Sequence, residues 1–380
     1  MKNTLLASTA LVCATLSVAA GERGIFGLYG DTPDAKHAWA VHDFNRPYPK
    51  QVETPPGKPP SDAIVLFDGT EESLQANWKN QKPKSKRMRW IVADGAVTCV
   101  PGKGSIMTKE NFGDCQLHVE WKVPEKVDKD FGNSGIMFLD GLYEVQVLES
   151  SNVEPSRSLW KPTNYADGQA GAVYGQNPPL VQPCRKPGEW QTYDIVFHPP
   201  LYEGKRLVDP GSVTVFFNGV LVQDCFPFQG RTGWCRRLPH SNKTSGGIML
   251  QNHGSPVSFR NIWVRKIPSR FADTVNGGLG LKMGDVAALR HKLAGESLEL
   301  AAKTQDAVEK YIRLWESYCY EPDRTTAAKI EAAEAVAIAA YREKKGSMAD
   351  NHHRGAFVRF VNMLVAGKWM SASSPVAKAL

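Results

Sequence analysis

The sequence predicts a mainly β protein, an antiparallel β-sandwich followed by a small α-helical region. Between residues 63 and 267, about a dozen short apolar or alternating segments follow one another without a helical period between them. Asn218-Gly219 separates two apolar runs, which is the strongest short-range signal for a β-hairpin, and Asp94-Gly95 separates another two. After Pro268 the spacing of the apolar residues changes to that of amphipathic helices.

The first 20 residues have the composition of a secretory signal peptide. Lys2 precedes an apolar run, Leu5–Val18, that ends in small residues. Val18 and Ala20 suit a cleavage site that follows Ala20, so we expect a secreted or periplasmic protein. No later stretch approaches the roughly 18 consecutive apolar residues of a membrane-spanning helix, so no transmembrane segment is expected.

Residues 21–62 form a proline-rich lead-in. Six prolines fall between Pro47 and Pro60, a density that excludes a helix and favours extended backbone. We expect this segment either to lie along the body of the protein or to be mobile.

The predicted sandwich spans residues 63–267, and each of its strands is a short apolar or alternating run that a turn signal closes. The expected strands are residues 64–67, 90–92, 96–100, 105–108, 115–123, 135–139, 143–148, 190–197, 213–217, 220–223, 247–251 and 257–267.

Residues 268–380 are expected to be helical. One apolar stripe runs from Val286 to Cys319 and stops before Pro322, and an alanine-rich helix follows over residues 326–344. A third helix carries apolar residues at helical spacing from Phe357 to Val365. We find no catalytic cluster here and expect either a small bundle or a clamp on the sandwich, through which the protein could form oligomers.

Charge and cysteine content restrict the partners and the chemistry. The net charge of +7 is spread along the chain without a recognition motif, so nucleic acid is not an expected partner. Six cysteines follow the signal peptide, and because none forms a CxxC pair, a zinc site is not expected. Cys225 and Cys235 flank a short loop and are the preferred disulfide pair, and Cys99 and Cys115 come second; buried free thiols are the alternative.

Two alternating segments carry acidic residues in the middle of predicted strands. His118 and Glu120 point to one side of the first segment, and Glu144 and Gln146 point to one side of the second. A glycine-rich turn, Gly132–Gly135, lies between the two segments. Side by side, the strands would place two carboxylates on one face, and enzymes that cleave glycosidic bonds use such a pair of carboxylates. The alternative is a solvated sheet face with ordinary surface acids.

Further polar residues fall at strand ends. His198 closes one strand, while Gln251 and His253 share one face of another, and Arg260 lies on the strand that follows. A histidine or arginine at such a place could polarise a substrate oxygen, but each could equally be a satisfied structural residue.

Many short segments of the sandwich resemble, in the same order, one known family. They are Leu66–Thr70, Trp90–Gly95, Gly104–Thr108, Phe112–Asp114, Leu117–Trp121, Gly132–Gly135, Tyr143–Val147, Gly171–Tyr174, Pro187–Trp190, Tyr193–His198, Val215–Gly219, Leu250–Gly254 and Arg260–Trp263. Together they resemble the 3-keto-disaccharide hydrolase domains, also described as 3-keto-glucoside 1,2-lyases and 3-keto-2-hydroxy-glucal hydratases. The resemblance covers residues 63–267.

The resemblance implies a concanavalin-A-like jelly roll with a sugar site on its concave face. With the residues above, it suggests Glu120, Glu144 and His253 as catalytic residues. The suggested substrate-binding residues are His118, Asn133, Gln146, Tyr174, His198, Gln251 and Arg260. Three departures from the family occur: leucines at 139 and 142 where the family often has arginine, Glu149 where it has aspartate, and Asn252 within the Leu250–Gly254 segment.

The expected reaction is cleavage of a 3-keto-glycoside by proton abstraction at C2, β-elimination and hydration. One of Glu120 and Glu144 would act as base and the other as acid or sugar anchor, with His253 and Arg260 supporting the developing oxyanion. The sequence requires no cofactor, although a divalent metal ion could serve instead of these side chains. A separate dehydrogenase would supply the ketone. The alternatives are a non-catalytic, lectin-like carbohydrate-binding domain and a cell-envelope interaction domain.

Overall fold

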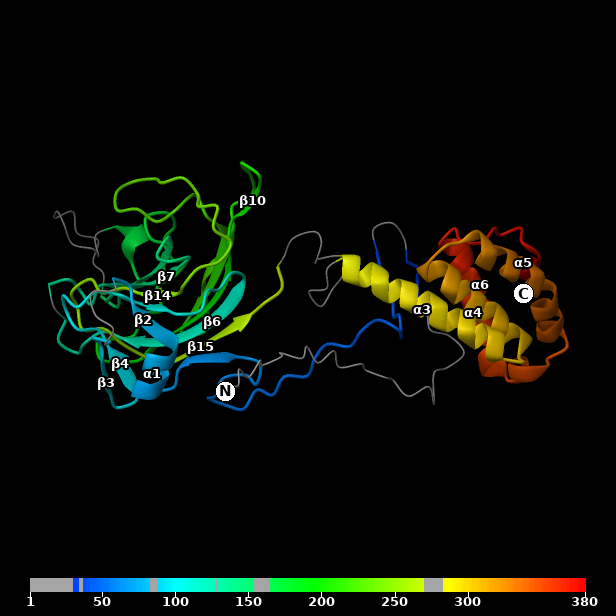
Figure 1. The fold of residues 1–380 in the computed structure, drawn as a ribbon, viewed down its shortest axis with the longest axis horizontal. Helices are drawn as coiled ribbons and strands as arrows, with labels where there is room; N and C mark the ends of the chain where they lie inside the picture. Colours follow the sequence, from blue (N-terminus) through cyan, green and yellow to red (C-terminus); the bar gives the residue numbers. More distant parts are fainter. Residues whose placement is uncertain (1–29, 34–36, 83–87, 128, 153–164, 270–282) are drawn as a thin grey trace, which may run out of the picture. The chain divides into compact units, whose positions relative to one another are not determined.

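Two antiparallel sheets pack face to face around one apolar core in the part of the chain between Pro49 and Gly280 (Figure 1). The computed structural model describes residues 30–33, 37–82, 88–127, 129–152, 165–269 and 283–380. The predicted signal peptide and its cleavage site lie outside these residues. The described residues before Pro49, together with residues 283–380, belong to a second compact unit, which has its own core.

The larger sheet has the strand order β13-β12-β9-β6-β15-β4-β3, and β1 also pairs with β15. Its strands are β1 (Ile64–Phe67), β3 (Ile91–Ala93), β4 (Ala96–Thr98), β6 (Cys115–Lys122), β9 (Gln191–His198), β12 (Ser212–Phe217), β13 (Val220–Pro227) and β15 (Ser258–Lys266).

The smaller sheet has the strand order β2-β5-β14-β7-β8. Its strands are β2 (Trp78–Asn80), β5 (Ile106–Thr108), β7 (Ser134–Phe138), β8 (Tyr143–Val147) and β14 (Met249–Leu250). Around the two sheets lie helix α1 (Glu71–Asn77), the short helix η2 (Ala166–Gly168) and a ribbon of β10 (Leu201–Glu203) and β11 (Arg206–Asp209). The predicted antiparallel sandwich is therefore confirmed, and the arrangement is consistent with a concanavalin-A-like fold.

Both hairpin signals form tight turns. Phe217 pairs with Val220 across Asn218-Gly219, whose φ angles are 50° and 80°. Asp94 and Gly95, with φ of 51° and 72°, join β3 to β4 in the same way. Two consecutive positive φ angles match the right-handed twist of the strands, which is why asparagine or aspartate followed by glycine is favoured here.

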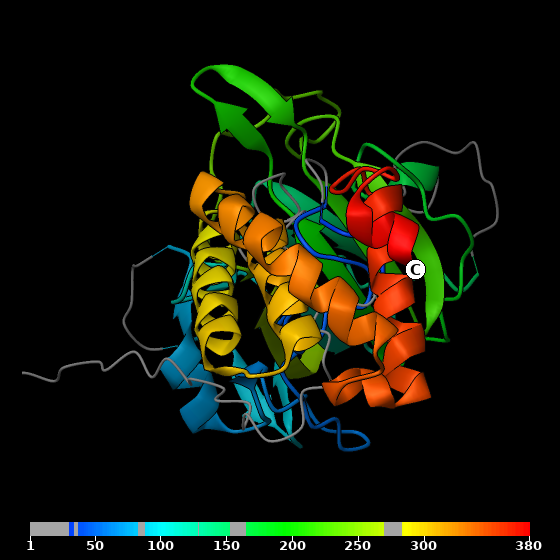
Figure 2. The ribbon, with the colours of Figure 1, turned by 90° about the vertical axis from the view of Figure 1, so that its right-hand side faces the viewer.

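The second unit contains a helical bundle (Figures 1 and 2). Its helices are α3 (Met283–Lys303), α4 (Ala307–Tyr320), α5 (Arg324–Arg342), η3 (Gly346–Ala349), α6 (Asn351–Ala366) and α7 (Pro375–Ala379). The apolar stripe from Val286 to Cys319 was expected to form one helix, but it forms two. The chain breaks because the Asp306 side chain accepts hydrogen bonds from the backbone N–H groups of Val308 and Glu309 and so caps a new helix.

Part of the proline-rich lead-in completes the helical core. Trp39, only 5% exposed, is buried among the helices together with its two neighbouring alanines. Behind it, the Tyr320 hydroxyl donates to Asp43 and accepts a hydrogen bond from Asn45 Nδ2. Residues 38–40 are thus part of the core of a unit whose helices come from the C-terminal part of the chain. Helical periodicity does not predict this contact.

None of the described cysteines forms a disulfide, so both predicted pairings are wrong. Cys225 and Cys235 are exposed thiols on different segments, and Cys99 and Cys115 are buried thiols. Burial raises the pKa of Cys99 to about 12, so it acts as a small apolar side chain. No helix in the described part of the chain is long and apolar enough to cross a membrane.

Candidate functional site

Glu120 and Glu144 lie on opposite sides of the sandwich, so the prediction that they share one surface is wrong. Glu120 is on β6 of the larger sheet and Glu144 on β8 of the smaller one. The apolar neighbours of each residue belong to the shared core, so the carboxylates point away from it in opposite directions. The physical reason is that the chain between β6 and β7 crosses from one sheet to the other.

The predicted site residues divide accordingly into two groups. His118, Glu120, His198 and Arg260 lie on the larger sheet. Asn133, Glu144, Gln146, Tyr174, Gln251 and His253 belong to the smaller sheet or to segments that adjoin it.

On the larger sheet, Glu120 is held by two hydrogen bonds. Arg260 Nε donates to it over 2.6 Å and Asn261 Nδ2 over 2.9 Å. Arg260 also lies over the Trp190 ring, 4.0 Å from its centre. Burial by itself would raise the pKa of Glu120, but the two hydrogen bonds and the charge of Arg260 outweigh it and lower that pKa. Glu120 is therefore a fixed anion in a structural network.

The two histidines of this sheet are also engaged. His118 Nδ1 lies 2.7 Å from Asp194 Oδ1, and its ring stacks on Trp263 with centroids 4.9 Å apart. His198 Nδ1 lies 2.6 Å from Asp114 Oδ1. Each imidazole is thus oriented by a carboxylate, and for His198 this is the satisfied state that the sequence left open as an alternative. A depression of about 420 Å³ adjoins Arg260, but Glu120 and both histidines lie outside its lining.

On the smaller sheet, Glu144 lies at the end of a row of methionines. Across the sheet, Glu144 is opposite Met137, Met137 is opposite Met249, and Met249 is opposite Met107. These side chains lie on the face turned away from the core, since alternate residues of each strand fill the core. They form an apolar and adaptable floor beside the carboxylate.

Gly135 makes room for the Glu144 carboxylate. A side chain at Gly135 would begin with a Cβ that overlaps Glu144 Oε1, so the carboxylate rests directly against the β7 backbone. A glycine inside a strand is unfavourable for the strand itself and often marks a close approach of another group. Gly135 was expected at the junction of the turn 132–135 and the strand 135–139, and the structure places it within β7.

Burial raises the pKa of Glu144 to about 8. The residue is 5% exposed, and among the described residues no side chain donates a hydrogen bond or pairs a cation with its carboxylate. Desolvation of the charged form is therefore uncompensated. A carboxylate that titrates near neutral pH can both accept and donate a proton under physiological conditions.

Two tyrosines lie beside Glu144, next to the edge of β8 that hydrogen-bonds to residues 171–174. The Tyr174 N–H donates to the Glu144 carbonyl oxygen, and the Tyr174 hydroxyl lies 3.3 Å from that of Tyr165. Burial and the neighbouring Tyr165 raise the pKa of Tyr174, and the charge of Glu144 adds to the effect. Tyr174 therefore remains a hydrogen-bond donor at neutral pH. Sequence reasoning missed Tyr165, which no motif indicates.

Amide side chains lie one row further along the same face. Gln146 is opposite Gly135, and Gln251 donates its N–H to the Gly135 carbonyl oxygen. Oε1 of Gln251 is buried and has no hydrogen-bond partner among the described residues, so it is available to a ligand hydroxyl. Asn133, 8% exposed, precedes β7 at this end. His253 is exposed just beyond β14, and no contact within the described residues joins it to Glu144.

The described residues around Glu144 do not form a set of metal ligands. In the portion of the chain that the structure describes, no three histidine, cysteine, aspartate or glutamate side chains gather closely enough to hold an ion. Glu144 has amide, hydroxyl and thioether neighbours, which are poor ligands for a divalent cation apart from the amide oxygens.

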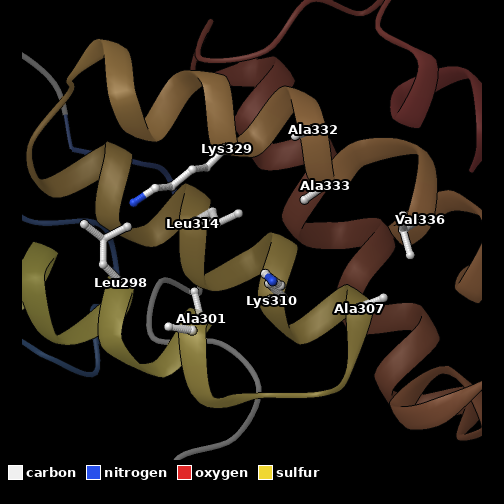
Figure 3. Close-up of a pocket in the computed structure, with 10 residues that line it drawn as sticks. Leu298, Ala301, Ala307, Lys310, Leu314, Lys329, Ala332, Ala333 and Val336 are labelled. Carbon is white, nitrogen blue, oxygen red and sulfur yellow. The ribbon is translucent and has the colours of Figure 1, made fainter.

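The helical unit contains a cavity of about 440 Å³ between α3, α4 and α5 (Figure 3). Its lining is leucine, alanine and valine with two lysines, Lys310 and Lys329. No acid, histidine, serine or cysteine is among these lining residues, and the two lysines are its only ionisable groups.

Comparisons with known proteins agree with the fold. The 3-keto-alpha-glucoside-1,2-lyase-like domain matches residues 62–265. A solved structure of a candidate glycosyl hydrolase from Parabacteroides distasonis ATCC 8503 is 38% identical, with a TM-score of 0.52, and the match covers 61% of this chain and 98% of that one.

Other likenesses are weaker. A second candidate glycosyl hydrolase from the same organism is 22% identical over 54% of this chain and 94% of that one, with a TM-score of 0.40. The alginate lyase Aly36B is 12% identical over 56% of this chain and 95% of that one, with a TM-score of 0.31. Neither bears on function, and no curated protein matches the chain. From the match over residues 62–265, the chain belongs to the family of 3-keto-alpha-glucoside-1,2-lyase-like domains, whose members act on carbohydrates.

Proposed function

We propose that the protein is an exported carbohydrate-active enzyme that cleaves 3-keto-glycosides, with Glu144 as its acid–base residue. The observation that carries the proposal is the raised pKa of Glu144, about 8, on a partly polar sheet face of a chain that belongs to this family. A carboxyl group that is present in both protonation states near neutral pH suits a reaction in which one group takes up a proton and then returns it.

The ketone at C3 makes the proton on C2 acidic, which defines the first step. Glu144 removes that proton, and the electron pair of the C2–H bond moves into the C2–C3 bond and onto the ketone oxygen. The Tyr174 hydroxyl donates a hydrogen bond to the resulting enolate. The unpaired Oε1 of Gln251 accepts a hydrogen bond from a sugar hydroxyl and fixes the ring on the methionine floor.

The enolate then expels the group at C1. The C1–O bond breaks, the departing oxygen takes the proton that Glu144 holds, and an unsaturated 3-keto sugar remains. Water adds its hydroxyl to C1 and a proton to C2, so the net change is hydrolysis. No electrons are exchanged with a cofactor, and the ketone must therefore come from a separate dehydrogenase that acts on the glycoside beforehand.

The two glutamates provide the test and its control. With a chromogenic 3-keto-glucoside, we expect Glu144→Gln to lower kcat by about 10²–10⁴-fold, the usual contribution of a general acid–base residue. Glu120→Gln removes a carboxylate of the structural network on the other sheet, and a variant that stays folded should keep most of the activity. Full activity of Glu144→Gln would refute the assignment, and sugar binding by the wild type without turnover would favour a lectin-like domain.

A further inference from the structure

The cavity of the helical unit is hollow because small side chains face one another across three helices. It measures about 440 Å³, and half of its ten lining residues are alanines: Ala301, Ala302, Ala307, Ala332 and Ala333. Leu314, 3% exposed, belongs to the core beneath it, whereas Val336 is 59% exposed. Packed helices normally fill the space between them with side chains, so alanines on α3, α4 and α5 leave room for a ligand. We call this space the alanine cavity.

The lining of the alanine cavity restricts the chemistry of its ligand. Apart from two lysines, each lining side chain is alanine, leucine or valine, and none of the ten can accept a hydrogen bond. A sugar, a nucleotide or an extended peptide would lose hydrogen bonds to water there without replacing them. A hydrocarbon chain has no such groups and gains free energy when its surface is buried. The lining therefore favours an apolar chain.

Two ammonium groups belong to the same lining. Lys310 on α4 and Lys329 on α5 are exposed, and Figure 3 shows Lys329 extending from α5 toward Leu298 on α3. Neither Lys310 nor Lys329 forms an ion pair with a described residue, whereas Lys292 and Lys303 on α3 both do. Both lining lysines are therefore available to an anionic group on a ligand.

Three acids that are close to the lining residues along the chain have other partners. Glu299 on α3 and Glu309 on α4 each form an ion pair with a basic residue of their own helix. The charge of Lys329 helps to lower the pKa of Asp323, but Asp323 caps α5 by accepting a hydrogen bond from the Thr326 N–H. Positive charge thus adjoins an apolar surface, and the complementary ligand is an apolar chain with one anionic end.

We propose that the alanine cavity binds a free fatty acid. The acyl chain lies against the alanines, and its carboxylate pairs with Lys310 and Lys329. The cavity follows α5 from Lys329 to Val336, about 10 Å at the rise of an α-helix. Its volume is in the lower part of the range for small-molecule sites, about 300–1,000 Å³, which suits one chain better than a lipid with two. The inference does not depend on the proposed function, because it concerns the helical unit and not Glu144.

Calorimetry with octanoate and its neutral counterpart 1-octanol separates the contribution of the carboxylate from that of the chain. We expect the full-length double variant Lys310→Gln with Lys329→Gln to bind octanoate about tenfold more weakly than wild type at low salt and to bind 1-octanol equally well. As a control, Lys292→Gln with Lys368→Gln removes two charges of the same unit outside the lining and should change neither affinity.

Chain length and a filled cavity test the apolar part of the site. From hexanoate to octanoate to decanoate, the affinity should rise by up to about fourfold for each methylene that is buried. Ala333→Phe should weaken binding of octanoate and 1-octanol alike by at least tenfold, because its ring occupies the space of the chain. Circular dichroism checks that the helices of this variant are retained, and the exposed lysine variants test the site independently of it.

Two results would overturn the inference. One is that octanoate and 1-octanol bind wild type equally well and the variant of both lining lysines changes neither affinity. The other is that no fatty acid binds, while sedimentation shows a dimer that Ala333→Phe disrupts, which would assign the alanine cavity to contact with a second copy of the chain.

Discussion

Replacing Glu144 by glutamine should stabilise the sandwich, and the gain should grow as the pH rises. The folded-state pKa is about 8, against an ordinary value of 4.5. Below pH 4.5 the side chain is protonated in both the folded and the unfolded chain. Between the two values the unfolded chain releases the proton and the folded chain retains it, so the free energy of unfolding falls as pH increases.

The size of this effect follows from the two pKa values. At about 1.4 kcal/mol per pK unit, the separation between 4.5 and about 8 corresponds to at most about 5 kcal/mol at pH well above 8. Glutamine cannot ionise, so Glu144→Gln removes this penalty. Its buried amide costs about 1–3 kcal/mol if unsatisfied, but equally at every pH. The diagnostic quantity is therefore the difference in free energy of unfolding between the variant and the wild type, and specifically how steeply this difference changes with pH.

Urea unfolding of the full chain at pH 4 to 9 measures that slope. Amide hydrogen exchange of β7 and β8 measures the stability of the sandwich separately from that of the helical unit, which has its own core. If the free energies of unfolding of Glu144→Gln and wild type differed by the same amount at all pH values, the Glu144 carboxylate would be hydrated in the folded protein. That result would refute the reasoning.

Glu120→Gln is the matched control because its sign is opposite. The pKa of Glu120 is lowered in the folded chain, so its carboxylate adds stability above the ordinary pKa of 4.5, and that stability is lost as pH falls through the folded-state value. Hydrogen bonds to charged groups contribute about 1.5–3 kcal/mol each. Glu120→Gln should therefore destabilise the protein near pH 7, and this effect should shrink as the pH falls below 4.5 and through the folded-state pKa.

Three further predictions use the same structure. Gly135→Ala should displace the Glu144 carboxylate, because the new Cβ overlaps its Oε1; kcat for a 3-keto-glucoside should fall at least tenfold while the circular dichroism spectrum is retained. Trp39→Ala should destabilise the helical unit by about 3–5 kcal/mol, seen as early loss of helical signal on heating, since it removes a buried indole. A thiol reagent under native conditions should modify Cys225 and Cys235 and leave the three buried cysteines unmodified, as mass spectrometry of peptides would show.

The sequence predicted the sandwich because strand period and turn chemistry are local properties. Asn218-Gly219 determines its own turn, and alternation decides which side of a strand is buried. Alternation cannot tell which sheet a strand joins, since the outer faces of both sheets have the same pattern. His118 and Glu120 were therefore assigned to the face of Glu144, and only the pairing of β6 with β9 and β15 corrects this.

Other features depend on contacts between distant segments. The Glu144 N–H donates a hydrogen bond to Thr232 Oγ1 across 88 residues of the chain, and no periodic pattern encodes that contact. The break near Asp306 could have been predicted, because aspartate is a preferred helix N-cap, but the apolar stripe continues across it. Trp39 joins a core built from the other end of the chain, where local signals carry no information.

The contrast between the two glutamates argues for function at Glu144. Each sits in the middle of an alternating strand, yet Glu120 has Arg260 and Asn261 as partners while no described side chain compensates Glu144. An uncompensated buried carboxylate destabilises the fold at neutral pH, and Gly135, needed to accommodate it, weakens β7 as well. A glutamine at 144 with alanine at 135 would relieve both costs in a purely structural sheet. Two unfavourable residues that accommodate one carboxylate are expected at a catalytic site rather than in a purely structural sheet.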